Sequence, residues 1–96
     1  MSVDEIKKRL YPIFHNNEIE RAVLFGSYAK GQASEKSDID ILIDSKGRLR
    51  GIDFFGVLDE ISTALGLPVD LIEMSQVVNG GHIEKEIAET GVVLYG

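Results

Sequence analysis

A short stretch in the first half of the chain alternates acidic with apolar residues, and it constrains the fold more than any other segment. Residues 38–44 read DIDILID. Alternation of acids with β-branched residues is typical of a half-buried strand. Asp38 and Asp40 then point to the same face, about 6–7 Å apart at Cα. Two like charges this close repel each other, and a nearby cation relieves the repulsion. A strand whose polar face meets solvent would show the same alternation, so this stretch alone leaves both interpretations open.

A Gly-Ser pair precedes this strand and completes a pattern that neither half makes alone. Gly26 and Ser27 are followed by ten residues and then by the Asp-Ile-Asp sequence that begins at Asp38. Glycine lets the backbone approach a phosphate without a Cβ in the way, and N–H groups at a helix start can hold phosphate oxygens. Paired carboxylates supply the hard oxygen ligands that Mg²⁺ uses when it bridges a protein and substrate phosphates. The pattern predicts a site for a nucleoside triphosphate with Mg²⁺.

A third candidate acid lies in the short apolar run PVDLI at residues 68–72. Asp70 stands between two apolar residues, where burial of an unpaired acid would be unfavourable. If its strand neighbours the aspartate strand, Asp70 can complete a three-carboxylate cluster. Glu73 is the rival, but strand alternation points it to the opposite face. The structural alternative is that Asp70 is an edge-strand acid that reaches solvent.

Helical and strand patterns alternate along the chain. Ser2 and Glu5 predict a capping box for a first amphipathic helix, which Pro12 is expected to end or kink near Tyr11. Asp53 is the expected cap of a later helix that stops at Gly66. The other expected elements are strands over 19–25, 38–44, 68–72 and 92–95, a helical turn over 27–30, a loop over 32–37 and a helix over about 82–89. This order predicts an α/β fold in which helices cover a small sheet.

Composition limits what the chain can bind. A length of 96 residues predicts one domain, over residues 1–96. The net charge of −6 argues against direct binding of nucleic acid, because that affinity depends on cationic side chains. A nucleotide that arrives with Mg²⁺ meets no such objection. The chain has no cysteine, no secretion signal and no apolar run of membrane-spanning length, so we expect a cytoplasmic location without a membrane partner.

At these residues the chain resembles the DNA polymerase β-like nucleotidyltransferase superfamily, and most closely its minimal nucleotidyltransferase (MNT) branch. The family pattern is Gly-Ser, ten residues, Asp-x-Asp and a later acid between apolar residues. Here it is met by Gly26, Ser27, Asp38, Asp40 and Asp70. The resemblance extends to the leading helix, the AVLFGSYAKG approach and the closing helix that runs into GVVLYG.

The resemblance implies a small mixed sheet with helices packed on one side. It implies nucleotidyl transfer, in which an acceptor hydroxyl attacks the α-phosphate of a triphosphate and pyrophosphate leaves. Two Mg²⁺ ions would be held by the carboxylates, with Asp38 and Asp40 shared between them. Asp70 would serve the nucleophile-side metal and help to deprotonate the acceptor. Gly26 and Ser27 would hold the terminal phosphates.

The resemblance also implies a partner. Members of the branch resemble antitoxins paired with a HEPN-domain ribonuclease toxin, which they inactivate by transferring AMP from ATP to a toxin tyrosine. Larger relatives carry an additional acceptor domain, for which 96 residues leave no room, so we expect another protein to present the hydroxyl. Two alternatives stay open. One is a nucleotidyltransferase subunit that acts on a small molecule or nucleic acid with a helper subunit, and the other is a non-catalytic antitoxin that neutralises its partner by occlusion.

Overall fold

The computed structural model describes residues 1–33 and 37–96, so the expected loop over 32–37 lies partly outside the described residues. Helices and strands alternate in the predicted order, with one short 3-10 helix added. Strand ends differ from the prediction by at most two residues. The elements are α1 (Val3–Asn16), β1 (Arg21–Phe25), α2 (Gly26–Ala29), β2 (Ile39–Asp44), α3 (Ile52–Leu65), β3 (Val69–Glu73), η1 (Met74–Gln76), α4 (His82–Thr90) and β4 (Val92–Tyr95).

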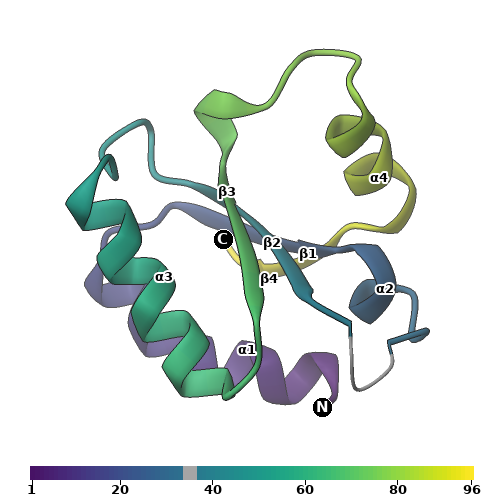
Figure 1. Cartoon of the computed structure of the whole chain (residues 1–96), viewed down its shortest axis with the longest axis horizontal. Helices are drawn as coiled ribbons and strands as arrows, with labels where there is room; N and C mark the ends of the chain where they lie inside the picture. The colour runs from purple at the N-terminus through teal and green to yellow at the C-terminus, as the bar shows by residue number, and fades with distance from the viewer. Residues whose placement is uncertain (34–36) are drawn as a thin grey trace.

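The four strands form one mixed sheet in the order β3-β2-β1-β4 (Figure 1). β1 runs antiparallel to β2 and to β4, whereas β2 and β3 are parallel. A parallel pair needs a crossover connection, and α3 provides it between β2 and β3. The predicted mixed α/β class with a small sheet is confirmed.

Helices cover both faces of the sheet, to different extents. The larger buried cluster joins one face to α1 and α3. Its residues are Ile6, Leu10, Phe14, Ile19, Ala22, Leu24, Ile39, Ile41, Ile43, Val57, Ile61, Leu65, Leu71 and Leu94. The opposite face carries a smaller cluster of Val23, Phe25 and Leu42, against which Ile83 and Ile87 of α4 pack. The family resemblance implied helices on one side. α1 and α3 follow it, while α4 lies over part of the other face (Figure 1).

α1 continues through Pro12, so of the two effects expected there, an end or a kink near Tyr11, the end is wrong. The helix extends to Asn16. The Phe14 side chain in its last turn is fully buried, and its ring lies 5.7 Å from the ring of Tyr95, measured between centroids. This packing outweighs the loss of one backbone hydrogen bond at the proline.

The helix caps follow the sequence with one exception. The Glu5 backbone N–H donates to Ser2 Oγ at 3.2 Å, which confirms the first cap. Gly66 ends α3 in the left-handed conformation, with φ at 66°, as predicted. The N-cap of α3 is Gly51 rather than the expected Asp53, which lies in the first turn, where a negative charge is favourable. Within the described ranges, no helix is both long enough and apolar enough to cross a membrane.

Candidate active site

Asp40 and Asp70 are paired across the boundary between β2 and β3. They are Cα partners in the parallel register, and both alternate with residues that point into the α1–α3 core. Their side chains therefore lie on the face that α4 partly covers. Asp40 is half-buried and Asp70 is exposed. β2 and β3 are therefore neighbours, which is the arrangement that a site shared by Asp40 and Asp70 requires.

Gly26 lies directly beside Asp40, where β1 ends and α2 begins. Phe25 pairs with Asp40 in the antiparallel register, and Gly26 follows with φ at +75°. A Cβ at this position would overlap Asp40 Oδ2 and would lie 3.3 Å from Asp40 Cγ. The turn therefore requires glycine for its left-handed backbone and for the close approach of the carboxylate. Ser27 comes next in α2 and is half-buried.

Asp38 lies just before β2 and is exposed. In the part of the chain that the structure describes, no three His, Cys, Asp or Glu side chains converge closely enough to hold a metal ion together. In place of the expected three-carboxylate cluster, the structure has the pair of Asp40 and Asp70, with Asp38 at the edge of that pair. Repulsion between like charges favours side-chain conformations that hold the carboxylates apart.

Negative charge accumulates around Asp40. Its pKa is raised from 3.8 to about 6, chiefly by burial and then by the charges of Asp70, Glu86 and Asp38, in that order. Carboxylate oxygens surrounded by uncompensated negative charge match the ligands that Mg²⁺ prefers, so these residues fit a divalent cation. Glu86 was not among the predicted site residues. No local pattern marks it, because it reaches the site only through the packing of α4 on the sheet.

Glu73, the rival third acid, faces the other side of the sheet. It pairs with Ile43 in the register, and only 2% of its surface is exposed. Its Oε2 accepts hydrogen bonds from the Ser45 N–H at 2.9 Å and Oγ at 2.6 Å, and its Oε1 accepts one from the Ser75 N–H at 2.8 Å. Burial raises the pKa of Glu73, but these bonds outweigh burial and the pKa is lowered overall. Glu73 ties the end of β3 to the turn after β2.

Three other polar residues lie on β2 or at the α2 turn: Asp44, Lys30 and Tyr28. Asp44 shares the face of the carboxylate pair but lies at the far end of β2, where Oδ1 accepts a hydrogen bond from the Lys46 N–H at 3.0 Å. Lys30, at the end of α2, is exposed. Tyr28 packs against the larger hydrophobic cluster. The residues brought together are therefore Gly26, Asp40 and Asp70, with Ser27, Asp38 and Glu86 around them.

Sequence comparison relates the chain to nucleotidyl-transferring proteins. The model of the polymerase β nucleotidyltransferase family matches residues 8–96. The protein adenylyltransferase MntA of Thermococcus cleftensis is 38% identical over 74 residues, which are 77% of this chain and 72% of that protein. A Methanocaldococcus jannaschii protein, provisionally named a protein adenylyltransferase, is 34% identical over 77 residues, which are 80% of this chain and 83% of that protein.

Solved structures share the fold at lower identity. A chain of a toxin–antitoxin crystal structure with AMP-PNP superposes with a TM-score of 0.80 at 24% identity, over 94% of this chain and 73% of that chain. A chain of the complex between an MNT antitoxin and a tri-AMPylated HEPN toxin of Shewanella oneidensis gives 0.75 at 21% identity, over 98% and 72%. At these identities the similarity establishes the architecture.

Proposed function

The chain belongs to the polymerase β nucleotidyltransferase family, and from this premise we propose that it transfers AMP from ATP to a hydroxyl of a partner protein. The names of its sequence relatives support protein adenylylation as the reaction. A structural neighbour in complex with an AMPylated HEPN toxin supports a toxin as the partner. The acceptor in this proposal is a tyrosine of a HEPN ribonuclease toxin, and its modification neutralises the toxin.

One observation carries the proposal. Asp40 and Asp70 are in register on neighbouring strands, and the Gly26 turn closes against Asp40. Such an arrangement places carboxylate ligands beside a backbone turn that can approach a phosphate closely. A protein that neutralised its partner by occlusion alone would have no need of it.

Each residue has a role in the proposed transfer. The Gly26 backbone and the Ser27 hydroxyl hold the terminal phosphates. Asp40 and Asp70 would hold Mg²⁺, and Asp38 would join them from the edge of the pair once the cation offsets the repulsion between the carboxylates. When bound, Mg²⁺ supplies positive charge at the α-phosphate and at the leaving oxygen. The acceptor oxygen forms a bond to the α-phosphorus while the bond from that phosphorus to the bridging oxygen breaks. Pyrophosphate leaves, and the hydroxyl proton passes to the Asp70 carboxylate.

Labelled ATP tests the proposal in the presence of the partner toxin. With the wild-type chain, α-labelled ATP should label the toxin and γ-labelled ATP should not, and peptide mass spectrometry should locate AMP on a tyrosine. Asp40→Asn should abolish labelling. Transfer of the γ label alone would indicate phosphorylation. If neither label transfers and toxin activity is still suppressed, the proposal fails and neutralisation by occlusion replaces it.

A further inference from the structure

An open pocket of about 150 Å³ lies on the same face of the sheet as the carboxylate pair. Its lining residues come from β2, from η1 and the segment after it, and from α4: Leu42, Met74, Val77, Asn79, Glu84 and Ile87. Leu42 follows Asp40 by two positions on β2, so the pocket floor lies about 6–7 Å from Asp40 along the strand. The ribose of a nucleotide spans a comparable distance between its α-phosphate and its base.

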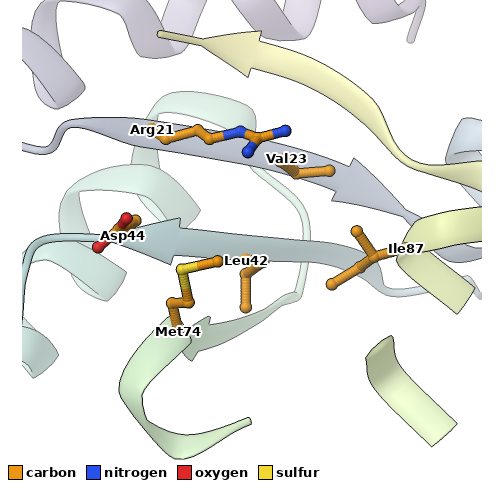
Figure 2. Close-up of a pocket in the computed structure, with 6 residues that line it drawn as sticks. All are labelled: Arg21, Val23, Leu42, Asp44, Met74 and Ile87. Atoms are coloured by element: carbon orange, nitrogen blue, oxygen red, sulfur yellow. The ribbon is translucent and has the colours of Figure 1, made fainter. Parts of the chain in front are cut away.

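A smaller hollow of about 50 Å³ adjoins this pocket and shares three of its lining residues, Leu42, Met74 and Ile87. Figure 2 shows Leu42 between Met74 and Ile87, with Asp44 beyond Met74. Asp44 lies four positions after Asp40 on β2, so this end of the hollow is the one farther from Asp40. The two hollows therefore lie side by side over β2.

The walls of the pocket suit a flat aromatic ring. Leu42, Val77 and Ile87 are apolar, and the thioether of Met74 makes favourable contacts with aromatic rings. Binding pockets for small molecules typically combine such walls with a few polar groups that fix orientation. Here the polar groups are Asn79 and Glu84.

These two polar groups match the edge of adenine. Within the described residues, neither the Asn79 amide nor the Glu84 carboxylate has a hydrogen-bond or ion-pair partner. An asparagine amide pairs with the N6 amino group and N7 of adenine, and a carboxylate accepts a further bond from an amino group. Guanine presents two acceptors, O6 and N7, on the same edge, which a carboxylate repels.

We propose that this pocket receives the adenine ring of ATP, with Asn79 as the residue that determines base specificity. The inference rests on the proposed function, because a nucleotide reaches the pocket with its base only when its α-phosphate lies at the carboxylate pair. Glu84 assists by accepting from the adenine amino group, and Met74 and Ile87 hold the two sides of the ring.

Equilibrium binding to the full chain with Mg²⁺ tests this assignment, with ATP, GTP, UTP and tripolyphosphate as probes. The wild type should bind ATP about tenfold or more tightly than GTP, because one bidentate base contact discriminates by roughly that factor. Asn79→Ala should weaken ATP binding about tenfold and leave tripolyphosphate binding unchanged. Val77→Trp should fill the pocket and reduce ATP binding to the level of tripolyphosphate. The matched control is Asn16→Ala, an exposed asparagine at the end of α1, which should bind like the wild type.

The outcomes separate this inference from the proposed function. Equal affinity of the wild type for ATP, GTP and UTP would overturn base recognition, as would full ATP preference in both Asn79→Ala and Val77→Trp. If ATP is preferred through Asn79 but no label reaches the partner toxin, the pocket assignment stands and protein adenylylation fails. If neither ATP nor tripolyphosphate binds, both fail together.

Discussion

Asp40 is the residue at which the requirements of folding and of the proposed chemistry conflict. Burial and three neighbouring acids favour its neutral form, and its pKa rises to about 6. Metal binding needs the ionised form, because carboxylates coordinate Mg²⁺ as anions. The metal-free protein therefore carries an unfavourable charge at neutral pH that a bound cation would relieve.

Removing this charge should stabilise the metal-free protein. The folded state binds a proton at Asp40 more tightly than the unfolded state does. The contribution of Asp40 to the free energy of unfolding therefore falls as the pH rises from 3.8 to about 6. Asp40→Asn should therefore raise the free energy of unfolding at pH 7.5 by about 1–2 kcal/mol, after discounting for solvent screening. The gain should roughly halve at pH 5. Urea denaturation with EDTA measures it, and Asp59→Asn, an exposed acid on α3, is the control. Destabilisation of Asp40→Asn at pH 7.5 would contradict a crowded carboxylate site.

A second prediction concerns the cost of replacing Gly26. Gly26 and Gly31 both have positive φ, +75° and +71°, but only Gly26 has the Asp40 carboxylate where a Cβ would lie. Gly31→Ala should cost about 1 kcal/mol for the left-handed backbone alone. Gly26→Ala should cost at least ~2 kcal/mol more, because the carboxylate must also move. Thermal unfolding of the two variants decides the matter, and equal costs would mean that the close approach is unimportant.

At the scale of elements, β3 assigns its two acids to opposite faces of the sheet. Asp70 lies beside Asp40 on one face, and Glu73 is buried on the other, beneath the turn that follows β2. Both positions follow from strand alternation, so sequence reasoning could separate them. It could not foresee the bonds from Ser45 and Ser75, since those depend on how the turn after β2 folds against η1.

The two acids should respond differently to neutralisation. Asp70→Asn should abolish AMP transfer and change the free energy of unfolding by less than about 0.5 kcal/mol, because Asp70 is exposed. Glu73→Gln should destabilise the protein by about 2–3 kcal/mol, because it disturbs charge-assisted bonds to buried groups. It should retain transfer when assayed below its melting temperature. Full activity in Asp70→Asn would move the third acid elsewhere.

Local sequence patterns were sufficient to predict the strands and the site residues that lie on them. They failed for features that depend on the packing of a helix against the sheet. The alternation in DIDILID and the Gly-Ser spacing predicted one site for Gly26, Asp38 and Asp40, and the structure places Gly26 against Asp40. The same reasoning allowed α1 to end at Pro12, because burial of Phe14 against the sheet is a tertiary contact that local pattern does not show. It missed Glu86 for a similar reason, since only the packing of α4 brings that side chain to Asp40.

Across the whole molecule, the two sheet faces have separate tasks. One is covered by α1 and α3 and forms the larger cluster. The other is only partly covered by α4 and carries the carboxylates and the pocket over Leu42. The molecule as a whole has a net charge of −6, which opposes the approach of a polyphosphate. Nucleotide binding should consequently depend on a cation that offsets this negative charge.

Thermal unfolding with added ligands tests this dependence. Mg²⁺ and ATP together, at about ten times the dissociation constant, should add ~1.4 kcal/mol and raise Tm by about 6–11 °C. ATP with EDTA should raise Tm far less, and Asp40→Asn should gain little under either condition. An equal rise with and without Mg²⁺ would show that the carboxylates do not bind nucleotide through a metal.

The parallel pairing of β2 with β3 also determines when the site forms during folding. Asp40 and Asp70 are 30 positions apart, and α3 forms the connection between their strands. The antiparallel pair of β1 and β2 brings the Gly26 turn against Asp40 across a shorter separation, and contacts of lower sequence separation tend to form earlier. During refolding, we expect ATP binding to recover later than protection of the β1–β2 amides from hydrogen exchange. A chain emerging from the ribosome would acquire half of its site first and remain unable to hold its substrate until the crossover helix docks.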